Sequence, residues 1–284
     1  MSRAPPAAAL TDEALLRFAH PERILATTRL PGVGTLSGKV LADLYGIDTR
    51  AYERTRRRWR EEAEHAVEAM LDDALVARLR ALPLARAARI TAFGDSITAD
   101  RQSWAELLCL ALDATRGRDR IEVINRGLSG DSTAGALTRL HDLRASRPDV
   151  VLILLGTNDA RRHEGVMLHS HRETARNLRA LRDVFLRAGW RCAWLTPPPL
   201  LPERVAEDRV LRERGIAWTH VDIVRKAAIV RSLPRGVIDL WPPFGDPPNG
   251  DLLLPDGLHP SLAGQQAILA AVLSQFPGSA PRAI

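Results

Sequence analysis

The sequence predicts an α/β protein with an open, doubly wound, mostly parallel sheet, preceded by a helical extension. From residue 88 onward, short apolar runs alternate with helical patterns in five strand–helix units, as expected of consecutive β–α units. The runs at 89–93, 121–125, 149–155 and 191–196 are mostly continuous rather than alternating. Continuous apolar runs are typical of parallel strands that helices cover on both faces.

Residues 1–87 are expected to form the helical extension, because they contain helical patterns and no strand signal. In the first helix, Thr11 is expected as the N-cap and Phe18 on the apolar face. A short helix is expected to end near Gly46. A long one is expected from Thr49 to about Leu82, and its apolar residues recur mostly at spacings of three and four. Such a stripe needs a partner, so we expect this helix to pack on the following region.

Residues 88–278 are expected to form the catalytic domain, followed by a tail at 279–284. A fifth strand is expected, less clearly, at 217–223. The segment 231–260 is dense in proline and glycine and holds two aromatic residues, which favours an ordered loop that walls a pocket. Helices are expected near 103–115, 133–145, 170–188, 202–214 and 261–275.

Composition and length are those of a globular protein. The chain has 284 residues, of which 45% are hydrophobic and 26% charged, enough to bury a sizeable core. No run approaches the roughly 18 apolar residues of a membrane span, and the first residues lack the apolar core of a secretory signal. The two cysteines fit free thiols in a reducing compartment. These features predict a cytoplasmic protein.

The net charge of +6 is carried by many arginines. Diffuse positive charge favours anions in general and does not by itself indicate nucleic acid. The densest basic run, RTRRRWR at 54–60, follows a stretch that loosely resembles the start of a helix-turn-helix. Two interpretations stay open: a DNA-binding appendage, or a solvated helix face whose Trp59 packs inward. We expect the second, so nucleic acid is not an expected partner.

Polar motifs follow the first three predicted strands of the domain or precede its last helix. They are GDS at 94–96, NRGLSGDS at 125–132, GTND at 156–159 and DGLHP at 256–260. In an open α/β sheet, ligands bind beyond the carboxyl ends of the strands. We therefore expect these four segments to meet at one rim of the sheet. Taken singly, each could be an ordinary turn, and the serine of GDS could simply cap a helix.

Together these residues match what acyl transfer needs. Ser96 is the candidate nucleophile, and a serine hydroxyl needs a base to take its proton. His259 is the candidate base, and Asp256 can hold the other ring nitrogen and stabilise the imidazolium. The tetrahedral intermediate carries an oxyanion, which needs preorganised donors. The backbone amides of Ser96 and Gly130 and the side-chain amide of Asn158 could supply three.

The four motifs resemble conserved blocks of the SGNH hydrolases, a branch of the GDSL esterase/lipase superfamily. The first block matches Gly94-Asp95-Ser96, although Ile97-Thr98 follow where the family often has Leu or Tyr. The second matches 125–130, the third 156–159 and the fifth 256–259, in the family's order. The resemblance covers about residues 88–278.

The resemblance implies a flavodoxin-like, three-layer α/β/α fold with five parallel strands in the order 2-1-3-4-5. It implies that Ser96, Asp256 and His259 are catalytic, that Ser96, Gly130 and Asn158 form the oxyanion hole, and that no metal or cofactor is used. The substrate would be a small-molecule ester with a small or medium acyl group. An acyltransferase using the same acyl-enzyme is the first alternative. A nucleic-acid-binding or regulatory protein with a vestigial hydrolase domain is the second.

Three further sets of residues have both a structural and a functional interpretation. Asp95 and Asp159 are acidic neighbours of candidate site residues, and we expect them to shape their turns rather than take part in chemistry. The histidines at 163, 169 and 171 lie near two glutamates but match no metal-binding spacing. We therefore expect a solvated helix start rather than a metal site. His220 is expected to be a structural residue in the fifth strand.

Overall fold

The structure is a computed structural model that describes residues 12–27 and 36–278. Two expectations from the sequence, the cap at Thr11 and the tail at 279–284, concern residues outside this part of the chain. The sequence also predicts a loop at 31–38, most of which lies outside it.

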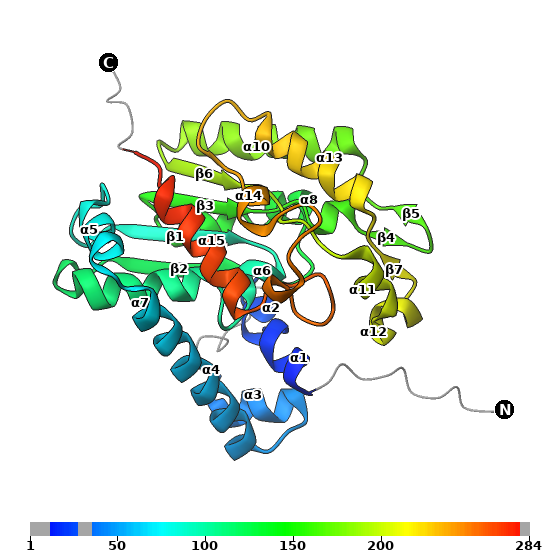
Figure 1. Ribbon diagram of the computed structural model, residues 1–284, viewed down its shortest axis with the longest axis horizontal. Helices are drawn as coiled ribbons and strands as arrows, with labels where there is room; N and C mark the ends of the chain where they lie inside the picture. Colours follow the sequence, from blue (N-terminus) through cyan, green and yellow to red (C-terminus); the bar gives the residue numbers. More distant parts are fainter. Residues whose placement is uncertain (1–11, 28–35, 279–284) are drawn as a thin grey trace.

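The core of the molecule is a five-stranded parallel sheet (Figure 1). Its order is β2-β1-β3-β6-β8, which is the order 2-1-3-4-5 that the sequence resemblance implies. From β1 the chain first adds β2 on one side and then crosses to add β3 on the other side of β1. The crevice beyond the carboxyl ends of β1 and β3 is therefore a topological switch point. The strands are β1 (Arg89–Gly94), β2 (Glu122–Gly127), β3 (Val150–Leu154), β6 (Arg191–Leu195) and β8 (Val237–Ile238).

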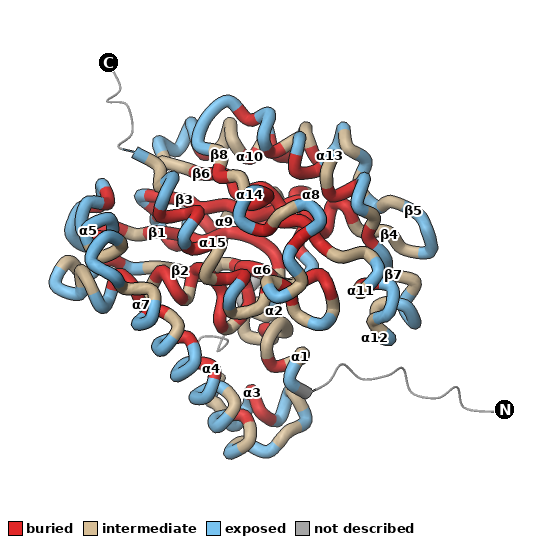
Figure 2. Tube along the Cα trace, in the orientation of Figure 1, coloured by how far each residue is buried: buried red, intermediate tan, exposed pale blue. Residues whose placement is uncertain are grey.

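Helices cover both faces of this sheet, which explains its continuous apolar strands. Every residue of β3 is buried, and alternate side chains of a strand point to opposite faces. Leu152 packs in a cluster with α7 (Trp104–Arg116) and α15 (Leu262–Ser274). Val151 and Ile153 pack in another cluster with α10 (His171–Arg187) and α13 (His220–Arg231). Figure 2 shows the buried residues concentrated along the central strands.

The expected fifth strand at 217–223 is wrong. Only β7 (Ile216–Ala217) is extended there, and it joins β4 (Arg162–His163) and β5 (Val166–Met167) in a small antiparallel sheet. The hydroxyl oxygen of Thr219 then accepts a hydrogen bond from the backbone amide of Asp222 and starts α13, so His220 is helical. The true fifth strand, β8, lies inside the proline-rich segment.

Several helices that the sequence predicts as continuous are divided in the structure, two of them at aspartate caps. The helix expected at 49–82 ends at Met70, and Asp72 starts a new one by accepting from the amide of Leu75. The segments at 133–145 and 202–214 divide at Arg139 and Asp208. The resulting helices are α4 (Thr49–Met70), α5 (Asp73–Ala81), α8 (Thr133–Thr138), α9 (Leu140–Ala145), α11 (Pro202–Glu207) and α12 (Arg209–Glu213).

The N-terminal helices pack on the α/β domain, as the apolar stripe predicts. Ala63 and Val67 of α4 and Leu79 of α5 belong to the same buried cluster as the sheet. Trp59 belongs instead to a separate cluster with the first helices, and α2 lies beside α6 (Figure 1). The first helices are α1 (Asp12–Phe18), α2 (Pro21–Thr27) and α3 (Gly38–Tyr45). The remaining short elements are η2 (Gly117–Asp119), which precedes β2, and α6 (Ser96–Ala99), η3 (Asn158–Ala160), α14 (Trp241–Phe244) and η4 (Gly250–Leu252).

Within the described residues, every helix is too short or too polar to cross a lipid bilayer.

Candidate active site

Ser96 is presented by a sharp turn from β1 into α6. Asp95 caps this helix, because its Oδ1 accepts from the amide of Ile97 at 3.0 Å, as the sequence predicts. Gly94 is required by close approach: a Cβ there would lie 2.4 Å from the hydroxyl of Thr98 and 2.5 Å from a carbonyl of β3. Ser96 itself is half-buried, whereas both its neighbours are buried. The turn therefore exposes one hydroxyl at the end of a buried strand.

The hydroxyl of Ser96 is one end of a continuous chain of hydrogen bonds. It lies 2.9 Å from Nε2 of His259, a residue 163 positions later. Nδ1 of the same ring lies 2.6 Å from Oδ2 of Asp256. A carboxylate can only accept, so Nδ1 carries the proton and donates it, which leaves Nε2 free to accept from the serine. The structure thus joins the three residues that the sequence proposed as catalytic.

Asp256 is fixed by its own backbone surroundings. Its Oδ1 accepts from the amides of Leu258 and His259, both at 2.9 Å. Burial alone would raise the pKa of Asp256, but the charge of His259 and the hydrogen bonds from its ring and from these two amides lower it overall. The carboxylate therefore stays ionised and points its second oxygen at the imidazole.

The interaction between Asp256 and His259 also determines the pKa of the imidazole. Burial disfavours the imidazolium, but the charge and hydrogen bond of Asp256 outweigh burial and raise the pKa of the ring above its ordinary value. Asp100 and Asp95 act in the same direction with smaller effect. Burial raises the pKa of both of these carboxyl groups, that of Asp95 to about 7. A base with an elevated pKa is suited to take a proton from a hydroxyl near neutral pH.

The three candidate oxyanion donors lie on the loops that follow the first three strands of the sheet. Gly130 has a left-handed φ of 79°, which a residue with a Cβ rarely adopts. The side-chain amide of Asn158 donates to the carbonyl of Asp131 at 2.9 Å, so it lies beside the Gly130 loop. The side-chain nitrogen of an asparagine carries two hydrogens. One is used in the bond to Asp131, and the second remains for a ligand. Together with the amide of Ser96, these groups can bind a developing oxyanion.

Asp159 differs from the simple turn role that the sequence suggests. It is fully buried and accepts hydrogen bonds from the backbone and the hydroxyl of Thr133 and from the hydroxyl of Thr174. Thr174 in turn accepts from Lys226 at 2.9 Å. Asp159 therefore ties the loop after β3 to the start of α8, and it holds the loops of Gly130 and Asn158 together.

No sequence motif predicts that Phe18 belongs to this site. Its ring stacks on the imidazole of His259 with the centroids 4.1 Å apart and the planes 24° from parallel. Spacing cannot reveal this contact, because the two residues lie near opposite ends of the chain. The apolar periodicity of α1 assigns Phe18 only to a buried helix face.

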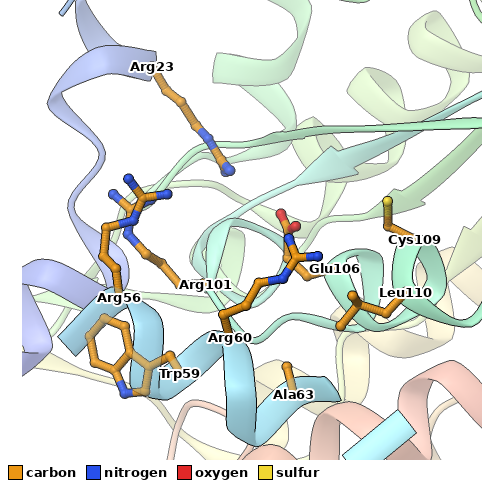
Figure 3. Close-up of a pocket in the computed structure, with 9 residues that line it drawn as sticks. All are labelled: Arg23, Arg56, Trp59, Arg60, Ala63, Arg101, Glu106, Cys109 and Leu110. Carbon is orange, nitrogen blue, oxygen red and sulfur yellow. The ribbon is translucent and has the colours of Figure 1, made fainter. Parts of the chain in front are cut away.

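A cavity of about 220 Å³ lies where the extension meets α7, and none of the candidate catalytic or oxyanion residues lines it (Figure 3). Arginines from three parts of the chain point into it, with Glu106 as the acidic residue of the lining. Its lining residues are Arg23, Arg56, Trp59, Arg60, Ala63, Arg101, Glu106, Cys109 and Leu110.

Two other clusters singled out in the sequence have plain structural surroundings. Trp59 packs inward and the arginines around it are exposed, which fits the solvated helix face, although Arg56 and Arg60 also line the cavity described above. In the described part of the chain, no group of three or more histidine, cysteine, aspartate or glutamate side chains is placed to hold a metal ion. His163 lies in β4, and His171 begins α10.

Comparisons with known proteins agree with this geometry. The model of the GDSL-like lipase/acylhydrolase family matches residues 92–267. Esterase TesA of Pseudomonas aeruginosa is 29% identical over 197 residues, which cover 66% of this chain and 87% of that protein. An arylesterase of Vibrio mimicus is 42% identical over 80 residues, 26% of this chain and 39% of that protein.

Solved structures show the same fold. The lipase/acylhydrolase of Enterococcus faecalis is 25% identical with a TM-score of 0.52, and the match covers 69% of this chain and all of that one. A catalytic mutant of the acetylxylan esterase Axe2 of Geobacillus stearothermophilus is 20% identical with a TM-score of 0.54, covering 72% of this chain and all of the other. The chain belongs to the GDSL-like lipase/acylhydrolase family and is a carboxylic ester hydrolase.

Proposed function

We propose that Ser96 is the nucleophile, His259 the general base and Asp256 the residue that orients the imidazole, in the hydrolysis of an ester with a small or medium acyl group. The observation that carries this proposal is the unbroken hydrogen-bond chain from Asp256 through His259 to Ser96. Each group in it has the role that its chemistry allows: acceptor, proton carrier and nucleophile.

The proposed reaction has two halves. The oxygen of Ser96 attacks the ester carbonyl while its proton moves to Nε2 of His259. The C–O bond to the alcohol then breaks, and the imidazolium returns the proton to the departing alkoxide. In the second half, His259 takes a proton from water, the resulting hydroxide attacks the acyl-serine, and the carboxylic acid is released as Ser96 regains its proton.

The oxyanion formed in each half is proposed to bind the amides of Ser96 and Gly130 and the side-chain amide of Asn158. In favour of this role, all three donors belong to loops at the carboxyl ends of neighbouring strands, where α/β enzymes bind their ligands. The hydrogen bond from Asn158 to Asp131 and the network of Asp159 fix these loops before substrate arrives. Fixed donors cost no reorganisation during the reaction.

The test is ester hydrolysis by single variants. Aryl esters are suitable probes, because one relative is an arylesterase. With p-nitrophenyl acetate, we expect Ser96→Ala and His259→Ala to lose nearly all turnover while both variants remain folded. A Ser96→Ala variant that hydrolyses the ester as fast as the parent would rule out the nucleophile.

Acyl transfer to an alcohol is the second candidate, and one observation favours it. The imidazole is only 16% exposed and one ring face is covered by Phe18, which limits the access of competing water. Product analysis with and without added methanol separates the two. Acetic acid alone in both samples supports hydrolysis, whereas methyl acetate as the main product supports transfer.

The domain boundaries and the location of the protein belong to the same proposal. The division into 1–87, 88–278 and 279–284 is supported by the family match, which starts at residue 92. A cytoplasmic location is supported by Cys109 and Cys192, which are free thiols whose pKa values burial raises. Such thiols are typical of a reducing compartment.

A further inference from the structure

The helical extension reaches the proposed catalytic base. Phe18 is the last residue of α1 and lies outside the region that the family model matches. Its ring covers a face of the His259 imidazole at a centroid distance of 4.1 Å. We call residues 12–27, which contain α1 and α2, the strap.

Hydrogen bonds hold the strap to the α/β domain at Phe18 and at the two residues before it. The Nε of Arg17 donates to both carboxylate oxygens of Asp100, at 2.9 and 3.0 Å. Asp100 directly follows α6 and is fully buried. Arg101 donates to the carbonyl of Leu16 at 3.0 Å, and the hydroxyl of Ser129 donates to the carbonyl of Phe18. The clamps come from the segments that carry Ser96 and Gly130.

The second helix of the strap is held in the same way. Arg23 donates to Oδ1 of Asn125 at 3.1 Å and to the carbonyl of Gly127 at 3.0 Å. Burial lowers the pKa of Arg23 to about 10, so it remains a cation at neutral pH. Its guanidinium also lines the cavity of Figure 3. Breaking such a buried, charged contact is costly, so the strap is built into the site.

The strap covers one ring face of the base, and both the base and the nucleophile remain half-buried. Ser96 lies between two buried neighbours, and the His259 side chain is 16% exposed. The hydrogen bonds of the imidazole to Asp256 and Ser96 run from its two nitrogens, and these lie in the ring plane. A ring held only in its plane can still tilt out of it, and a phenyl face stacked on it opposes that motion.

We propose that Phe18 is a positioning residue, which holds the imidazole of His259 in the orientation that bonds Asp256 and Ser96, and that the strap is a permanent wall of the ester site. This inference rests on the function proposed above. The aromatic face also stabilises the imidazolium that forms when the base takes the proton. A displacement of about 1 Å in a reacting group can lower a rate roughly 10²-fold, so a positioning contact has a measurable effect.

The test compares three substitutions of Phe18 in the full chain. With p-nitrophenyl acetate, we expect Phe18→Ala to lower kcat about 10- to 100-fold with KM changed less than about twofold. Phe18→Tyr keeps the ring face and should recover most of kcat, and Phe18→Leu should fall between the two. The control is Leu44→Ala in α3, which removes an apolar side chain that is 55% exposed and should keep the parental kcat.

The outcomes separate a positioning role from other roles. If Phe18→Ala keeps the parental kcat, or gains activity because the ring is a plug, the proposal is overturned. It is also overturned if the Ala and Tyr variants lose activity equally, in step with a lower Tm, because the effect is then only structural. The control for the underlying function is Ser96→Ala: if Ser96→Ala is active, the proposed function itself fails, whatever Phe18 does.

Discussion

Replacing Asp256 by Asn should greatly lower activity by changing the tautomer of His259, with little change in fold. Oδ1 of Asp256 accepts from two backbone amides at 2.9 Å. An asparagine must keep its carbonyl oxygen there, since an NH₂ group would meet two donors. Its NH₂ group is then aimed at Nδ1 of His259, where the carboxylate oxygen lay at 2.6 Å.

Two donors cannot share that hydrogen bond, so the ring must lose its proton at Nδ1 and carry it on Nε2. Nε2 then faces the hydroxyl of Ser96 as a donor and cannot take its proton. The corresponding substitution in a serine protease triad lowers kcat about 10⁴-fold, and about 1.4 kcal/mol corresponds to each factor of ten. We therefore expect kcat for p-nitrophenyl acetate to fall about 10³- to 10⁴-fold, or roughly 4–5.5 kcal/mol.

The matched control is Asp251→Asn, an exposed acidic residue of the same loop region. It removes the same charge from the protein and should leave kcat within about twofold of the parent. Circular dichroism and Tm show whether both variants keep the fold. If Asp256→Asn retains kcat within about tenfold, the imidazole does not depend on this carboxylate, and the tautomer argument is refuted.

Three further predictions follow from the same geometry. The pKa of His259 is raised and the ring must be neutral to act as base, so kcat/KM should rise with pH through a midpoint above about 6.5; a rate flat from about pH 4 to 9 would contradict this role. Gly94→Ala places a Cβ 2.4 Å from the Thr98 hydroxyl and should destabilise the protein by about 1–3 kcal/mol, seen as a lower Tm together with reduced activity; an unchanged Tm would show that the turn has room. Asn158→Ala removes one candidate oxyanion donor and should lower kcat about 10²- to 10³-fold, whereas a kcat close to that of the parent would exclude that role.

Most of the site could be predicted from the sequence because the strands of the sheet are parallel. Motifs at the ends of different strands then meet at the same edge of the sheet. The segments at 94–96, 125–130 and 156–159 lie at or just after the carboxyl ends of β1, β2 and β3, and the carboxyl ends of parallel strands lie at one rim. The segment at 256–259 precedes the last helix and reaches the same rim. In this fold, the position of a motif relative to the strands along the chain therefore predicts where the motif lies in space.

The fifth strand shows where local patterns fail. β8 has only two residues, Val237 and Ile238, and exists because they pair with Trp194 and Leu195 of β6. A pairing of that length leaves no periodicity in the sequence. The more β-like segment at 217–223 becomes helical from His220, because Thr219 caps α13. A single polar cap outweighed the local strand propensity there.

The contacts of the extension with the proposed site could not be predicted from the sequence either. The apolar stripe of α4 correctly indicated that the extension packs on the domain, since stripes report burial. A stripe does not report which surface it meets. The contact of Phe18 with His259 and the clamp of Arg17 on Asp100 join positions that no spacing rule connects.

Covalent labelling with an aryl fluorophosphonate, read by intact mass and peptide mapping, tests directly whether His259 activates Ser96. We expect one adduct per chain, on Ser96, formed at a rate that falls sharply in His259→Ala although Ser96 is still present. Labelling of a different residue, or equally fast labelling of Ser96 without His259, would contradict it.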